Sequence, residues 1–212
     1  MRNLLVISAV GMMAVAASAS TIDYNTSGST LSCGTAVGGC VQDSATSISL
    51  GGITFTYNPA IVTSGVFPPS ITSLGTLVSS GTGTDVLFSG AVLTIKIDDT
   101  TLGMSGDLPT GLFSGNISTA SSSLFVTFAP DNATTIYGTL PSVVLTSGLT
   151  TDTFQVYNVT EGVEDPSDPE ASPGSTSLQG DVVQNVAPEP ATLAMLGAGL
   201  LALGTIRRKR KA

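Results

Sequence analysis

Carboxylates are the side chains of this chain with the clearest capacity for chemistry, because histidine is absent and only two cysteines are present. Calcium takes six to eight oxygen ligands, many of them from acidic loop residues. The acids that cluster along the sequence are Asp98, Asp99, Glu161, Glu164, Asp165 and Asp168. We consider them candidate calcium ligands, with solvated loop carboxylates as the alternative, since the chain has no D-x-D-x-D-G loop. No other cofactor is expected.

The same inventory of residues argues against catalysis. Without histidine the chain cannot build a Ser-His-Asp or Cys-His site or a histidine-based zinc site. Glycoside hydrolysis needs two carboxyls about 5 to 10 Å apart, and Asp98 and Asp99, as successive residues of a strand, should point in opposite directions. The chain has no tryptophan and is 5% aromatic, whereas glycosidase sites use aromatic platforms. We therefore expect a protein that is not an enzyme, with a secreted hydrolase as the less favoured alternative.

Charge is distributed unevenly along the sequence. Between residues 20 and 184 the only basic residue is Lys96, against fourteen acids, so this part has a net charge of 1 − 14 = −13. One lysine cannot neutralise a run of phosphates, which excludes nucleic acid as a partner. Divalent cations, cationic surfaces and neutral glycans remain compatible with this charge.

The two cysteines, Cys33 and Cys40, are separated by a glycine-rich stretch that can fold back on itself. Their spacing is not the C-x-x-C of redox proteins. In an exported chain it predicts a structural disulfide close to the start of the folded part.

Apolar residues alternate with polar ones at a period of two, which is the signature of half-buried strands. The pattern is clear at 53–57, 93–97, 124–128 and 154–158, and shorter candidates lie at 71–78, 85–88, 112–117, 135–137, 143–145 and 177–184. Residues 161–174 hold three prolines and five carboxylates and are expected to form a loop. The predicted fold class is all-β, an antiparallel β-sandwich of jelly-roll type. A β-solenoid is the alternative, but no fixed repeat supports it.

The first 19 residues have the pattern of a signal peptide. Arg2 precedes an apolar stretch, and Ala17-Ser18-Ala19 is an A-x-A cleavage site. We expect export through the Sec translocon, cleavage by signal peptidase, and a passenger domain at residues 20–184.

Residues 185–212 have a tripartite pattern: Pro188, Glu189 and Pro190, an apolar run at 191–206, and the basic residues Arg207, Arg208, Lys209, Arg210 and Lys211. As a helix the apolar run would be about 24 Å long, which is slightly short for a bilayer core of about 30 Å. The basic cluster is typical of the cytoplasmic end of a transmembrane helix. The pattern predicts a single membrane anchor with the passenger outside.

This tail resembles the PEP-CTERM sorting signal of exopolysaccharide-producing bacteria, with Ala187 where valine is common. The resemblance implies recognition, and cleavage, by a membrane exosortase. It also implies an inner-membrane stage through the C-terminal helix before the protein reaches the cell surface or the extracellular space. Tails of this type are also named after ice-binding proteins that carry them. Ice binding is not expected of this passenger, because its threonines do not recur as a repeat.

Together these features predict an exported surface or matrix protein with a structural or adhesive role in biofilm or exopolysaccharide. A carbohydrate- or calcium-binding β-sandwich module is the alternative.

Overall fold

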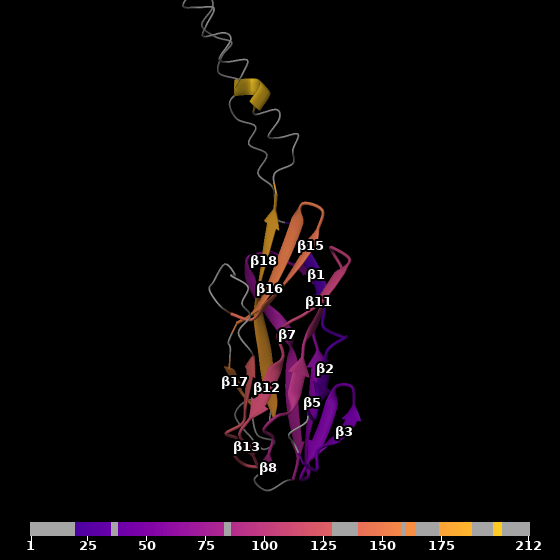
Figure 1. The fold of residues 1–212 in the computed structure, drawn as a ribbon, viewed down its shortest axis with the longest axis vertical. Helices are drawn as coiled ribbons and strands as arrows, with labels where there is room; N and C mark the ends of the chain where they lie inside the picture. Colours follow the sequence, from indigo (N-terminus) through magenta and orange to yellow (C-terminus); the bar gives the residue numbers. More distant parts are fainter. Residues whose placement is uncertain are drawn as a thin grey trace, which may run out of the picture. The chain divides into compact units, whose positions relative to one another are not determined.

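The computed structural model describes residues 20–34, 38–82, 86–128, 140–157, 160–163, 174–187 and 197–200. Two compact units are present, one formed by Ser20–Asn185 and the other by Met1–Ala19 with Val186–Ala212. The first unit is built almost entirely of antiparallel strands (Figure 1). This confirms the predicted all-β sandwich.

The largest sheet, sheet C, has seven strands in the order β15-β16-β18-β7-β5-β4-β3. Their bounds are β3 Val41–Ser44, β4 Ser47–Leu50, β5 Ile53–Pro59, β7 Ser70–Gly81, β15 Ser142–Ser147, β16 Thr150–Val156 and β18 Ser175–Val186. The long strands β7 and β18 lie side by side in the middle of the sheet (Figure 1). They join the β15-β16 hairpin on one side to the β3-β4-β5 meander on the other.

Two smaller sheets and a two-stranded ribbon form the rest of the unit. Sheet A has the order β11-β10-β1-β6, sheet B the order β17-β14-β12-β9-β2, and the ribbon pairs β13 with β8. The strands are β1 Ile22–Asn25, β2 Thr30–Ser32, β6 Ile61–Val66, β8 Val86–Leu87, β9 Val92–Thr94, β10 Lys96–Asp99, β11 Met104–Asp107, β12 Gly111–Ser114, β13 Asn116–Ile117, β14 Phe125–Phe128 and β17 Thr160–Gly162. Only Ile95 separates β9 from β10, and its carbonyl accepts a hydrogen bond from the Leu108 amide at 2.8 Å. Sheets A and B therefore continue into one another.

The core lies between sheet C and the combined sheets A and B. Alternate residues of each strand face inward, as a period of two requires. On β5 these are Ile53, Phe55 and Tyr57, all at most 1% exposed. Phe55 packs edge-to-face on Phe88 with ring centroids 4.6 Å apart, and Tyr24 of β1 packs in the same way on Phe154 of β16 at 5.1 Å. These aromatic contacts join the two layers.

The strand predictions were confirmed for most alternating segments, with three differences. The segment predicted at 93–97 is divided at Ile95, and the one at 112–117 is divided at Gly115. Gly115 has a φ of +118°, and a Cβ there would lie 2.1 Å from the Ser123 carbonyl oxygen. Glu161 was wrongly assigned to a loop, because it lies in β17 opposite Val126 of β14. The segment 135–137 lies outside the described residues.

Candidate functional site

The acids proposed as calcium ligands that lie in the described part of the chain, Asp98, Asp99 and Glu161, do not form a cluster. Asp98 and Asp99 point to opposite faces of β10, as the alternation predicted: Asp99 is 1% exposed, whereas Asp98 forms an ion pair with Lys96 at 3.2 Å. Glu161 lies in sheet B, and Glu164, Asp165 and Asp168 lie outside the described residues. Within the described ranges no three acidic or cysteine side chains come together as metal ligands. Calcium binding by these residues stays a prediction.

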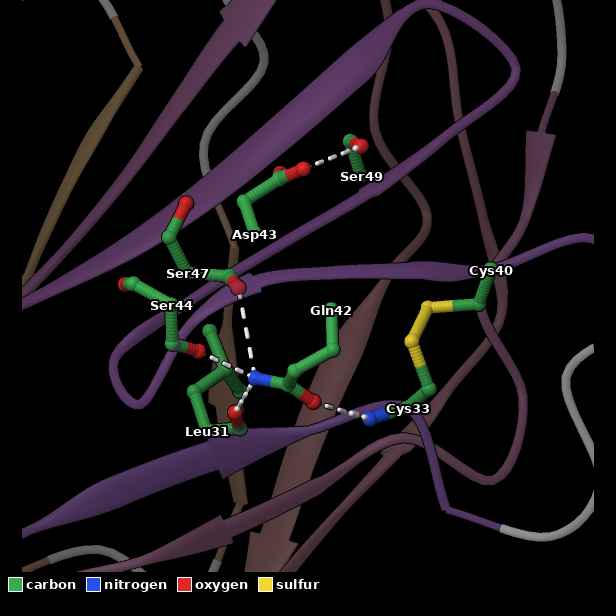
Figure 2. The surroundings of a disulfide bond; sticks show 8 residues. All are labelled: Leu31, Cys33, Cys40, Gln42, Asp43, Ser44, Ser47 and Ser49. Carbon is green, nitrogen blue, oxygen red and sulfur yellow. Dashed lines mark hydrogen bonds between the residues drawn. A yellow bond between two sulfur atoms is a disulfide. The ribbon is translucent and has the colours of Figure 1, made fainter.

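A disulfide joins Cys33 to Cys40, with their Cα atoms 5.8 Å apart. Cys33 follows β2 of sheet B and Cys40 precedes β3 of sheet C, so the disulfide connects the two layers at one edge of the sandwich. Figure 2 shows Gln42 beside it, with its amide nitrogen donating to the Leu31 carbonyl at 2.6 Å. The same nitrogen lies within hydrogen-bonding distance of the Ser44 and Ser47 carbonyl oxygens. This arrangement is structural, because the hydrogen bonds satisfy backbone groups where β2 and β3 approach each other.

Reducing the disulfide should therefore destabilise the protein without unfolding it. Closing a loop of eight residues contributes about 2 kcal/mol in the chain-entropy account, which corresponds to a fall in Tm of about 4 to 8 °C for a domain of this size. The measurement is thermal unfolding of the purified protein with and without reductant, with the Cys33→Ser, Cys40→Ser double variant as control. If reductant lowered the Tm of that variant as well, the effect would not arise from this bond.

Two buried tyrosines are hydrogen-bonding groups of the core. The Tyr57 hydroxyl lies 2.9 Å from Thr26 Oγ1 and also contacts the Leu74 carbonyl, and Thr26 Oγ1 accepts a hydrogen bond from the Ala60 amide at 2.8 Å. Burial raises the pKa of Tyr57 and raises the pKa of Tyr24 to about 12, although the hydrogen bonds of Tyr57 with Thr26 and of Tyr24 with Thr72 oppose these rises. Both phenols therefore stay protonated at neutral pH and cannot act as bases or nucleophiles.

The outer face of sheet C carries a regular array of uncharged polar side chains, which we call the hydroxyl face. It consists of Ser47, Ser49, Thr54, Thr56, Asn58, Thr76, Val78, Ser80, Ser175 and Ser177. The strand register aligns these residues in rows, such as Ser49 with Thr54 and Ser80. Neighbours in a row lie about 4.8 Å apart, and successive rows about 6.8 Å apart. Nine of its ten residues present hydrogen-bond donors and acceptors on a regular grid, and Val78 is apolar. None of the ten is charged, but at the β3 edge the Asp43 carboxylate accepts a hydrogen bond from Ser49 at 3.2 Å.

Part of this face could be predicted from the alternation on β5. Thr54 and Thr56 alternate with the buried residues of β5, so their outward direction could be inferred from the pattern. Their pairing with Ser49 and Ser47 on one side and with Ser80 and Val78 on the other depends on strand register, which the pattern does not contain.

The predicted sorting tail is described only in part. Pro188, Glu189, Pro190 and the basic residues from Arg207 to Lys211 lie outside the described residues. Of the predicted helix at 191–206, residues 197–200 are described, and they are helical. No helix in the described ranges is long and apolar enough to cross a membrane.

Comparison with known proteins gives a match in the tail. The family model of the PEP-CTERM protein-sorting motif matches residues 186–211. No curated protein and no solved structure matches the chain. The match confirms the resemblance drawn from the Pro-Glu-Pro core, the apolar run and the basic cluster. It identifies a signal for export and for sorting by an exosortase.

Proposed function

We propose that this chain, which carries a PEP-CTERM sorting motif, is a non-enzymatic structural and adhesive protein of the extracellular polysaccharide matrix. The motif is the observation that carries the proposal, since it assigns the β-sandwich to an exosortase route. The passenger would be delivered through a membrane-held stage to the cell surface or the matrix around it. Its activity there would be adhesion through its exposed surface.

The hydroxyl face supports adhesion to a neutral polysaccharide. Serine and threonine hydroxyls both donate and accept hydrogen bonds, which matches the hydroxyl groups of a glycan. Each exposed hydrogen bond contributes little, about 1 kcal/mol or less. A polymer that engages several rows at once gains by avidity, because each later contact forms within an existing complex.

Charge favours a neutral glycan over an acidic one. The passenger has one lysine against fourteen acids, and Lys96 is already paired with Asp98. A polyuronate would be repelled by this surface at low ionic strength. An uncharged polymer would meet no such repulsion, and contact with the rows of Thr54, Thr56 and Asn58 would not require desolvation of a charged side chain on those residues.

The experiment measures sedimentation of the purified protein with the neutral extracellular polysaccharide of the cells that make it, and with alginate as the acidic comparison. The test variant is Ser80→Glu with Ser177→Glu, because both serines are exposed on the hydroxyl face. Binding to the neutral polymer should weaken about tenfold or more, since each new carboxylate must be desolvated for contact. Alginate should bind neither the wild type nor the variant.

The matched control is Ser105→Glu with Ser114→Glu, which adds the same charge at exposed serines of sheets A and B. It should bind the neutral polymer as the wild type does. Equal loss of binding in both double variants would remove the hydroxyl face as the binding surface. Absence of binding by the wild type would contradict the adhesive role.

A further inference from the structure

Two acids from different sheets meet inside the core. Asp99 of β10 is the Cα partner of Tyr24, whose ring packs on Phe154 of β16. Asp152 lies two residues before Phe154 and so faces the same side of β16. Sheets A and C also come together at Gly106 of β11, where a Cβ would lie 3.0 Å from the side chain of Leu145 on β15. Leu145 is the Cα partner of Asp152, which places Asp152 against sheet A.

The two carboxyl groups are buried, and three of their four oxygens have no hydrogen-bond partner within the described residues. Asp99 is 1% exposed and Asp152 is fully buried. Asp99 Oδ1 accepts a hydrogen bond from the Leu102 amide at 2.9 Å, but Asp99 Oδ2 and both oxygens of Asp152 have no partner. Two ionised carboxylates in such a position would each pay the cost of desolvation and would also repel each other. One bound proton removes the repulsion and the desolvation cost of one carboxylate, and the neutral carboxyl can then donate a hydrogen bond to the carboxylate that remains.

In the part of the chain that the structure describes, none of the charged groups on the neighbouring strands places a positive charge beside the pair that could compensate two ionised carboxylates. On β10, Lys96 lies on the opposite face from Asp99 and pairs with Asp98. On β11 the titratable residue is Asp107, which is exposed. On β1 the titratable residues are Asp23, on the opposite face, and Tyr24, whose hydroxyl contacts Thr72. On β18, Asp181 is half-buried and adds negative charge, whereas Gln184 is neutral. The Gln184 amide favours the ionised form of Asp152, which opposes the rise of its pKa without cancelling it.

We propose that Asp99 and Asp152 share one proton and form a pH-sensitive contact between the two layers of the sandwich. The proton sits on one carboxyl and is donated to a free oxygen of the other, so the protonated pair carries a single negative charge. When the shared proton leaves, β10 and β16 face each other with two buried charges, and the contact loosens. The layers are then held together by the aromatic core and by the Cys33–Cys40 disulfide, which lies at the edge where β2 of sheet B and β3 of sheet C approach each other.

The direction of the pH effect follows from the titration of Asp152. Burial, together with hydrogen bonding and charge repulsion from Asp99, raises the pKa of Asp152 to about 7. In the unfolded chain an aspartate releases its proton near pH 4. Between these values the native state holds a proton that the unfolded state has lost, so stability falls as the pH rises toward 7. Above pH 7 both states have released it, and this contribution becomes constant.

The test is thermal unfolding of the purified full-length protein between pH 5 and pH 8. The wild type should lose about 5 to 10 °C of Tm over this range. Asp152→Asn should remove most of that loss and have an equal or higher Tm at pH 8, because an amide supplies the missing donor without a charge. Asp107→Asn, an exposed acid of the adjacent strand, should keep the wild-type loss.

A second measurement does not depend on how well a variant folds. The infrared carbonyl band of a protonated carboxyl should be present in the wild type at pH 6 and disappear near pH 8, and Asp99→Asn should shift the pH at which this occurs. A band that is absent at pH 6 would overturn the proposal. So would an Asp152→Asn protein that keeps the full pH dependence. If millimolar calcium at pH 8 raised the Tm of the wild type but not of Asp152→Asn, the pair would be a cation site instead.

Discussion

Replacing Pro188, Glu189 and Pro190 with alanine is expected to leave the protein unprocessed, at its full mass and in the membrane fraction. The family match covers residues 186–211 and includes this tripeptide. Prolines hold the backbone and the residue before each of them in an extended conformation, the form in which a peptide fits a processing enzyme. Alanine favours helix instead, so the apolar helix could extend into the cleavage region.

The apolar run explains why failure to cleave would retain the protein. As a helix, the sixteen residues of 191–206 would be about 24 Å long. A bilayer would accommodate that length by local thinning and by extension of the flanking basic side chains toward the interface. In the wild type we expect this hold to be temporary, with most of the protein released at reduced mass. In the triple variant almost none should be released.

The passenger supplies a matched control of the same composition. Pro166, Pro169 and Glu170 are two prolines and a glutamate outside the sorting motif, and their replacement with alanine should leave processing unchanged. The measurements are the intact mass of the protein in membrane and medium fractions, and the released fraction of each variant. Normal mass and release from the Pro188, Glu189, Pro190 variant would contradict sorting by an exosortase.

The fold class and most long strands could be predicted because burial imposes a period of two on the sequence. Ile53, Phe55 and Tyr57 alternate with polar residues and are all buried in β5. The prediction omitted β1, although its Ile22 and Tyr24 are buried at a period of two. Two other omitted strands, β3 and β11, carry little of this signal. All four residues of β3, Val41 to Ser44, are exposed at the edge of sheet C, and β11 begins with Met104 and Ser105, both exposed. An exposed edge strand has no buried face to mark it.

The acid pair illustrates what the sequence contained and what it did not. Asp152 is in phase with Phe154 and Val156, the buried apolar residues of β16, so its inward direction could be inferred from alternation. Asp99 is likewise in phase with Ile97 on β10. That the two acids meet depends on how sheet A packs on sheet C, with 52 residues of chain between them. Such a contact is a property of the tertiary structure, as is the register of the hydroxyl face.

The interlayer core leads to the second large effect, since Phe55→Ala should lower the free energy of unfolding by about 4 kcal/mol. Phe55 is fully buried, and its ring contacts Phe88 at 4.6 Å and Phe113 at 5.8 Å, both across the interface between layers. Truncation of a buried phenylalanine costs about 3 to 5 kcal/mol through lost transfer energy and the cavity that remains. Loss of two aromatic contacts places the expected value in the upper part of that range.

Phe125→Ala is the matched control for this prediction. Phe125 lies on β14 of sheet B but points outward and is 45% exposed. The same truncation there leaves no closed cavity, and its cost should be about 1 kcal/mol or less. Chemical denaturation of both variants gives the comparison, with Phe55→Leu expected between them because leucine fills part of the space. Equal destabilisation by Phe55→Ala and Phe125→Ala would mean that the contact between Phe55 and sheet B does not hold the two layers together.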